Sequence, residues 1–167
     1  MELRLLHAKE AKAYWNLRLT ALKESPEAFL LTLEEELNRS SPIKAVSTQL
    51  KDPFRMTIGC FNSEELIGTI TLQREVYTKL KHKGNILLFY IKKEYRNQGL
   101  GRKMLQSVIA LAKEHKLEQL ILSVVSTNKK ATNLYESFGF KIFGKELNAL
   151  KYKGAYLDES HMILYLK

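Results

Sequence analysis

The chain has 167 residues, which is the usual size of one domain and is long enough to bury a hydrophobic core. Its 45% hydrophobic and 27% charged residues are ordinary for a globular protein, and no apolar run approaches the ~18 residues of a membrane-spanning helix. The one cysteine, Cys60, excludes an internal disulfide, so with no signal-peptide pattern after Met1 we expect a single cytoplasmic domain over residues 1–167.

The net charge of +9 favours polyanionic partners, among which nucleic acids and phosphorylated cofactors both qualify. The lysines are scattered along most of the chain and are not gathered into a basic arm. No aromatic-plus-basic RNA motif, zinc-ligand spacing or heptad repeat accompanies them. We therefore expect no nucleic-acid partner, no membrane partner and no metal.

The first part of the chain predicts one strand followed by helices. Glu2–Leu6 alternates apolar residues, as a strand does, and Ala8–Lys23 places Ala11, Trp15, Leu19 and Leu22 on one helical stripe. Ser41 and Pro42 predict an N-cap and the first turn of another helix, which ends before Pro53. Residues 24–51 are thus expected to be helical and loop-like.

The middle of the chain predicts an antiparallel meander of three strands. Phe54–Phe61 and Leu66–Val76 are joined by a polar turn, and a second polar connection over residues 79–84 leads to the apolar run Ile86–Ile91. This last run has the pattern of a strand buried on both faces. Cys60 lies within the first of these strands and is interpreted as a small buried hydrophobic residue.

The last part predicts a crossover and two final strands. Leu100–Lys116 reads as an amphipathic helix, and Leu120–Val125 as a short strand that lies parallel to Ile86–Ile91 through a right-handed crossover. Thr127 or Asn128 caps a short helix that ends at Gly139. Strands over Phe140–Phe143 and Ala155–Leu166 complete the chain.

A glycine-bearing turn connects the Ile86–Ile91 strand to the following helix, and such a turn aims backbone N–H groups at one point. The Walker pattern is absent, and the dinucleotide fingerprint fails because Met104 occupies its third glycine position. The pattern R/Q-x-x-G-x-G/A is matched by Arg96, Gly99 and Gly101. This resembles the coenzyme A pyrophosphate loop of the GCN5-related N-acetyltransferases (GNAT family).

A second motif strengthens the resemblance. About one helix and one strand downstream, the chain carries N-x-x-A-x-x-L-Y-x-x-x-G-F, which begins at Asn128 and includes Tyr135. The predicted element order matches the GNAT fold along the whole chain. The resemblance implies an α/β (α+β) architecture: a mixed, mostly antiparallel sheet with a splayed parallel pair at its centre and helices on both faces.

The resemblance also assigns roles to residues of an acetyl-CoA site. Pantetheine would pair with the backbone of Phe89 and Ile91, and the N–H near Tyr90 is a candidate catalytic donor to the thioester oxygen. Arg96 either shapes the loop or contacts phosphate. Asn128 caps its helix, contacts the pantetheine arm, or does both. The pyrophosphate would be wrapped by the backbone of Asn97, Gln98, Gly99, Leu100, Gly101 and Arg102.

The implied reaction is direct attack of a primary amine on acetyl-CoA through one tetrahedral intermediate, with Tyr135 as the general acid that protonates the departing thiolate. The histone-acetylating branch of the family uses a glutamate base near the start of the central strand, where this chain has Asn85. Glu75, His82 and His161 are interpreted as surface or structural residues, and a water chain is an equal alternative. The base is therefore unassigned.

The alternative function is a non-catalytic acyl-CoA-binding sensor or partner module on the same fold. Retention of Tyr135 and Asn128 favours the enzyme. The acceptor amine, a small molecule or a protein amine, is not specified by the segments expected to shape its site, and a homodimer is a further expectation from the family. Those segments are Trp15–Leu33, Tyr77–Lys83 and Leu147–Tyr156.

Overall fold

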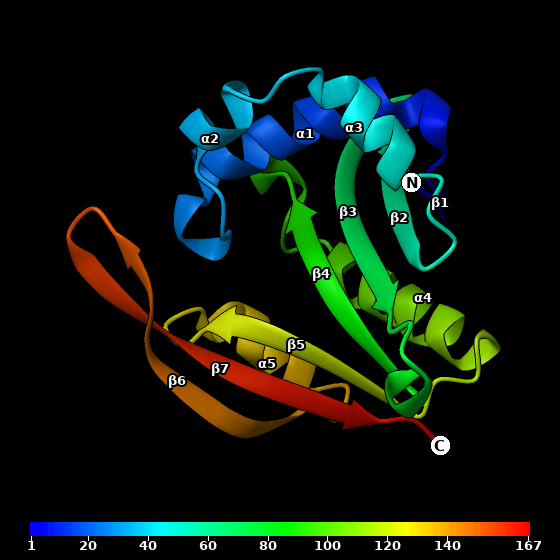
Figure 1. The fold of residues 1–167 in the computed structure, drawn as a ribbon, viewed down its shortest axis with the longest axis vertical. Helices are drawn as coiled ribbons and strands as arrows, with labels where there is room; N and C mark the ends of the chain where they lie inside the picture. Colours follow the sequence, from blue (N-terminus) through cyan, green and yellow to red (C-terminus); the bar gives the residue numbers. More distant parts are fainter.

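A computed structural model describes residues 1–167 and contains one seven-stranded sheet in the order β1-β2-β3-β4-β5-β7-β6 (Figure 1). Only the central pair, β4 and β5, is parallel, and the other five pairs are antiparallel. The predicted mixed sheet with a central parallel pair is confirmed. The strands are β1 Glu2–Leu5, β2 Arg55–Asn62, β3 Glu65–Arg74, β4 Lys83–Ile91, β5 Gln119–Val125, β6 Lys141–Tyr152 and β7 Ala155–Tyr165.

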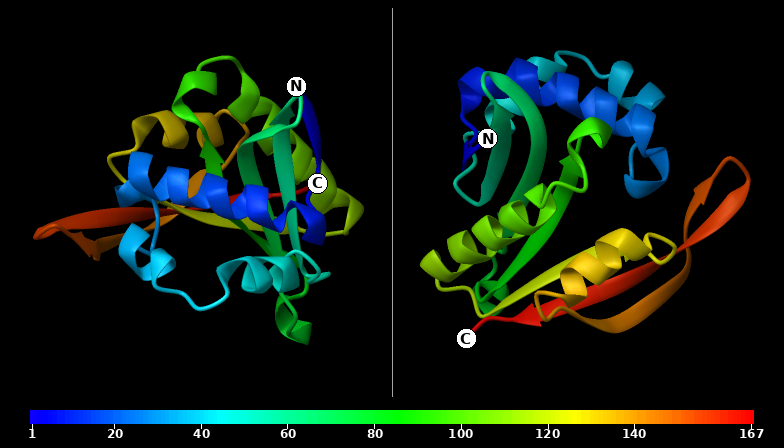
Figure 2. Two further views of the ribbon diagram at one scale, coloured as in Figure 1. Left: turned by 90° about the horizontal axis from the view of Figure 1, so that it is seen from above. Right: turned by 180° about the vertical axis from the view of Figure 1, so that it is seen from behind.

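Helices cover both faces of the sheet, as predicted (Figure 2). One face carries α1 Ala11–Glu24, α2 Leu33–Leu37 and α3 Pro42–Gln49, and the other carries α4 Leu100–Glu114 and α5 Lys129–Glu136. None of these helices is both long and apolar enough to span a membrane. Four 3₁₀ turns complete the fold: η1 Ala8–Glu10, η2 Pro26–Ala28, η3 Thr78–Leu80 and η4 Lys93–Tyr95.

The core is divided by the sheet into two apolar clusters. The α4-side core lies beneath α4 and α5 and includes Met104, Leu105, Val108, Leu120, Leu122, Tyr135 and Met162. The α1-side core lies beneath α1 and includes Tyr14, Leu17, Ala21, Val46 and Tyr90. Because successive residues of a strand point to opposite faces, these two clusters reveal which face each strand residue occupies.

Helix α1 is buried on a wider surface than the predicted stripe. Leu19 is only half-buried, whereas Tyr14, Leu17 and Ala21 are buried in addition to Trp15. The reason is that α1 packs against the sheet on one side and against α3 on another. A single apolar stripe therefore does not account for all the buried residues of α1.

Strand β6 is much longer than the predicted Phe140–Phe143, since it runs from Lys141 to Tyr152 and forms a hairpin with β7 that projects from the molecule (Figure 1). Two register shifts interrupt it, and the second includes Asn148, whose φ is +55° and whose N–H donates to Asp158 Oδ1 at 3.0 Å. These bulges interrupt the alternation of side chains between the two faces, which is the pattern by which a strand is predicted from sequence.

Ser41 occupies the predicted N-cap position of α3, and Pro42 is the first helical residue. The expected capping hydrogen bond is not formed, because Ser41 has a left-handed conformation with φ +50° and its hydroxyl contacts no backbone N–H of the helix. The proline alone therefore marks this helix start.

Candidate active site

The parallel strands β4 and β5 separate along their length. They pair only where Lys83–Asn85 faces Gln119–Ile121, although the strands continue to Ile91 and Val125 (Figure 1). Beyond the paired residues, one backbone edge of β4 lacks a strand partner. An unpaired strand edge of this kind can accept an extended amide chain as an added strand.

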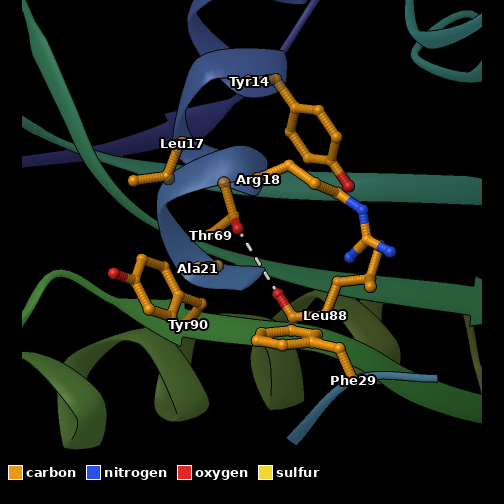
Figure 3. Close-up of a pocket in the computed structure, with 8 residues that line it drawn as sticks. All are labelled: Tyr14, Leu17, Arg18, Ala21, Phe29, Thr69, Leu88 and Tyr90. Carbon is orange, nitrogen blue, oxygen red and sulfur yellow. Dashed lines mark hydrogen bonds between the residues drawn. The ribbon is translucent and has the colours of Figure 1, made fainter. Parts of the chain in front are cut away.

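A β-bulge in β4 causes the separation. Thr71 of β3 faces Leu87, but Thr69 faces Tyr90, so β4 carries one extra residue between these pairs. Leu88 lies within the bulge, has φ +52°, and its carbonyl oxygen accepts from Thr69 Oγ1 at 3.4 Å (Figure 3). Bulges bend the strand that contains them, and this one bends β4 away from β5.

The hydrogen bonds around the bulge show which backbone groups face the gap. Lys92 N–H donates to Ile67 of β3 at 2.9 Å, whereas the carbonyl of Ile91 points away from β3 and accepts from Arg96 Nε at 2.7 Å. Since antiparallel ladders alternate, Tyr90 directs its backbone toward β3, and Phe89 and Ile91 direct theirs toward the gap. The sequence predicted an unpaired N–H near Tyr90. In the structure, the backbone amides that face the gap are those of its neighbours Phe89 and Ile91.

The loop after β4 leads into α4 without a capping side chain. Gly99 is the N-cap with φ +76°, Asn97 also has a positive φ of 62°, and no side chain accepts a hydrogen bond from the first turn of α4. A Cβ atom on Gly99 would meet nothing within 4 Å, so the space before the helix is open. Uncapped N–H groups that face open space at the positive end of a helix are suited to bind phosphate.

The side chains of this loop are engaged within the protein. Besides Ile91, the guanidinium of Arg96 lies over the ring of Tyr90, 5.4 Å from its centroid. Arg102 Nη2 donates to Ser137 Oγ at 3.1 Å, and Gln98 Nε2 donates to the Glu94 carbonyl at 3.2 Å. Of the two roles left open for Arg96, these contacts favour shaping the loop.

Tyr135 lies in α5, but its ring reaches β4. The ring centroid lies 6.3 Å from that of Phe89 and 5.8 Å from that of Phe140, and only 7% of the residue is exposed. Burial raises the pKa of the Tyr135 hydroxyl far above its ordinary value of 10.0. Tyr135 is therefore protonated at neutral pH, as an ordinary tyrosine also is, and it stays so to more alkaline pH.

Asn128 is the N-cap of α5, and its Oδ1 accepts from the Ala131 N–H at 3.2 Å. The side chain therefore has the capping role that the sequence left open. The remaining oxygen lone pair and the amide N–H groups of Asn128 are not used by this bond. A contact with pantetheine is compatible with the cap.

A small pocket lies on the opposite face of β4, between α1 and the bulge (Figure 3). Phe29 and Tyr90 form one wall with ring centroids 6.3 Å apart, and Arg18 is held by an ion pair with Glu36 at 3.0 Å. The pocket thus places aromatic and polar groups next to the bulged backbone. Its lining residues are Tyr14, Leu17, Arg18, Ala21, Phe29, Thr69, Leu88 and Tyr90.

Glu24 connects this pocket to the loop between β4 and α4, and sequence reasoning did not find it. Its Oε2 accepts from the Tyr90 hydroxyl at 2.5 Å and lies 3.8 Å from Arg96 Nη2. Burial, and then the Glu24 carboxylate, raise the pKa of Tyr90 above its ordinary value of 10.0. Because 66 residues separate Glu24 from Tyr90, no local sequence pattern connects them.

The other candidate bases occupy different parts of the sheet. Glu75 Oε1 accepts from Asn85 Nδ2 at 2.8 Å, and His82 Nε2 lies 3.4 Å from Gln119 Nε2. Both belong to the end of β4 where it is paired with β5, away from the bulge. No group of three or more His, Cys, Asp or Glu side chains is arranged to hold a metal ion.

Comparison with known proteins identifies the family. The profile described as the acetyltransferase (GNAT) family matches residues 15–140. The chain belongs to the GNAT family of acetyltransferases. This agrees with the element order, the glycine loop and the Asn128–Phe140 motif, and the predicted class of enzyme, an N-acetyltransferase, is confirmed.

Two curated relatives differ in the amines that their names specify. The spermine/spermidine N(1)-acetyltransferase of Bacillus subtilis strain 168 is 28% identical over 138 residues, which cover 78% of this chain and 91% of that protein. The N-alpha-acetyltransferase 30 of Homo sapiens is 25% identical over 120 residues, which cover 64% of this chain and 33% of that protein.

Solved GNAT structures share the fold of this chain along nearly its full length. A probable acetyltransferase from Staphylococcus epidermidis ATCC 12228 superposes with a TM-score of 0.82 and 26% identity, covering 99% of each chain. The yncA protein of Salmonella typhimurium, a putative acetyltransferase solved with its cofactor acetyl-CoA, gives a TM-score of 0.79 at 16% identity over 100% of this chain and 94% of that one.

Proposed function

We propose that this GNAT protein transfers an acetyl group from acetyl-CoA to a primary amine by direct attack, through one tetrahedral intermediate. The observation that carries the proposal is the gap between β4 and β5, which leads from the uncapped start of α4 to the ring of Tyr135. The uncapped helix start, the unpaired edge of β4 and the Tyr135 ring beside Phe89 support this proposal.

The residues present fit coenzyme A part by part. The open space at Gly99 and the first N–H groups of α4 suit a pyrophosphate. The gap-facing backbone of Phe89 and Ile91 suits pantetheine, whose amides can donate and accept like a strand. Gly101 lies beside Leu134 and Phe89, where a side chain of its own would crowd the same passage.

The chemistry follows from this placement. An amide N–H of Phe89 or Ile91 donates to the thioester oxygen as negative charge develops there. Tyr135, whose hydroxyl is protonated at neutral pH, donates its proton to the departing thiolate. The amine approaches from the face of Tyr90 and Phe29, and holding both reactants on one scaffold supplies much of the rate acceleration.

The test begins with calorimetric titration of the protein with acetyl-CoA and with free coenzyme A. Acetyl-CoA is then mixed with spermidine, or with a short peptide that has a free N-terminus, and released thiol is recorded. Cys60 is fully buried, so a thiol reagent detects coenzyme A with little background from the folded protein.

Binding of both nucleotides with amine-dependent thiol release would support the transferase. Binding without release across a wide panel of amines would instead favour the acyl-CoA-binding module. If neither nucleotide binds, the site is misassigned and both proposals fail.

A further inference from the structure

A chain of three polar side chains crosses β5, β7 and β6 outside the site described above. Ser123 Oγ lies 2.7 Å from His161 Nδ1, and His161 Nε2 lies 3.2 Å from Glu146 Oε2. Ser123 and His161 are directly opposite each other in the β5–β7 ladder. A hydroxyl, an imidazole and a carboxylate in this order form a proton path whose base is oriented by a third group.

The three side chains lie on the face of the sheet that carries α1 and the pocket beside Tyr90; we call this the acceptor face. Leu122 and Met162, the neighbours of Ser123 and His161 along their strands, point into the α4-side core. Alternation therefore places Ser123 and His161 on the opposite face, which is the face where Tyr90 points into the α1-side core. The proton path and the acceptor pocket share one side of the sheet.

Ser123 also lies at the start of the gap. The last residue of β5 that pairs with β4 is Ile121, and Ser123 is two residues beyond it, or roughly 7 Å along the strand. Its hydroxyl is exposed in the part of β5 that no longer pairs with β4. Ser123 therefore lies on the stretch of β5 that borders the gap.

We propose that Ser123, His161 and Glu146 deprotonate the acceptor ammonium group; this inference rests on the proposed acetyl transfer. The ammonium gives a proton to Ser123 Oγ as the hydroxyl proton passes to His161 Nδ1, which leaves a neutral amine and an imidazolium. The imidazolium then donates through Nε2–H to Glu146. The amine lone pair, now free, attacks the thioester carbon.

Charged side chains other than Glu146 also lie near this part of the face, including Glu27 of η2, which contacts β5. The other charged side chains that the register places on this face near His161 are Glu159, two residues back along β7, and Lys141 on β6. The ring centroid of Phe143 lies 6.2 Å from that of the imidazole. His161 is catalytic in this scheme only through Ser123, and Glu146 is a positioning residue.

The first test measures the tautomer of His161 and needs no acceptor. Long-range ¹H–¹⁵N spectra of the histidine-labelled protein at neutral pH should show Nε2 protonated and Nδ1 bare, since Nδ1 must accept from Ser123. Glu146→Gln should disturb this preference. A neutral ring protonated at Nδ1 would overturn the proposal whether or not the protein acetylates amines.

The second test measures thiol release with spermidine as a function of pH. His161→Gln should lower kcat about 10²-fold near pH 7 and recover toward wild type as pH nears ~10, where alkylammonium groups deprotonate unaided. Ser123→Ala should also lower kcat near pH 7, but by a smaller factor. Acetyl-CoA affinity should be unchanged in both variants.

The matched control is His115→Gln, which changes an exposed histidine at the end of α4 and should keep the wild-type pH profile. Equal loss at every pH in His161→Gln would indicate a structural role and overturn the relay. If wild type binds acetyl-CoA but acetylates no amine, the proposed function fails, while the tautomer measurement still decides the geometry of the relay.

Discussion

At the scale of single residues, Tyr135 and Tyr90 show how one side-chain type serves two purposes on the two faces of β4. Tyr135 is buried against Phe89 and Phe140, and desolvation is the only cause of its raised pKa. Tyr90 instead donates to Glu24, which adds to the rise. The first packs against Phe89 and is the proposed proton donor, and the second links the end of α1 to β4 beside Arg96.

Replacing Tyr135 with phenylalanine should remove the acid and leave the packing. We expect Tyr135→Phe to lower turnover roughly 10²-fold while the acetyl-CoA dissociation constant stays within about a factor of two. Stopped-flow thiol detection and calorimetry measure the two quantities. Unchanged turnover at saturating substrate would remove Tyr135 from the mechanism.

The same residue should affect stability at alkaline pH. Below about pH 10 tyrosine is neutral in both the folded and unfolded states, but above it only the unfolded chain ionises, so the free energy of unfolding falls as pH rises. The raised pKa of folded Tyr135 makes its share of this fall up to about 1.4 kcal/mol per pH unit. Urea unfolding between pH 8 and 11 should show a shallower fall for Tyr135→Phe than for wild type, and parallel curves would contradict the assignment.

At the scale of elements, the start of α4 depends on a glycine that the loop geometry requires. Gly99 has φ +76° and open space where a Cβ would lie. Gly154 in the β6–β7 turn has φ +81° and equally open space. The two glycines thus share the same backbone conformation, but only one of them faces the proposed phosphate site.

This pair allows strain to be separated from binding. Gly99→Ala and Gly154→Ala should each cost roughly 1–2 kcal/mol of stability. Only Gly99→Ala should weaken coenzyme A binding, by about tenfold or more, since its methyl group and the altered loop block close approach of the backbone to phosphate. Calorimetry and thermal unfolding measure both, and equal affinities in the two variants would show that the loop does not hold the pyrophosphate.

The elements also show what could be predicted from sequence and what could not. Helix α4 was predicted closely because its apolar residues recur with helical spacing after a glycine loop. The bulge at Leu88 was not located from its own residues, because leucine gives no signal for a positive φ. The predicted strand at Phe140–Phe143 was too short, because the two bulges of β6 break the alternating pattern and most of its residues are exposed.

The candidate site divides in the same way. The proposed cofactor side is encoded in contiguous motifs, so the glycine loop, Asn128 and Tyr135 could be named from the sequence. The proposed acceptor side is built from residues distant in the chain, such as Glu24 with Tyr90 and Ser123 with His161. Such contacts depend on the tertiary fold, and a single sequence contains no spacing rule that identifies them.

At the scale of the whole molecule, the net charge of +9 attracts anionic ligands and repels cationic ones. Coenzyme A is a polyanion, and the positive field of the protein should raise both its local concentration and its affinity. Polyamines are polycations and are repelled at long range. On α1 and α2, however, Glu24, Glu34, Glu35 and Glu36 carry negative charge, although Glu24 pairs with Arg96 and Glu36 with Arg18 and Arg39.

The salt dependence of ligand binding should therefore distinguish the effect of the net charge from the effect of the carboxylates on α1 and α2. Between about 0.05 and 0.5 M salt the screening length falls several-fold, so we expect the coenzyme A dissociation constant to rise by roughly three- to tenfold. Dephospho-coenzyme A, which lacks the 3′-phosphate, should show a smaller rise and serves as the control. If spermidine is an acceptor and the net charge governs its approach, its kcat/KM measured at saturating acetyl-CoA should increase over the same range. A decrease would mean that the carboxylates of α1 and α2 attract the polyamine strongly enough to outweigh a field of nine positive charges.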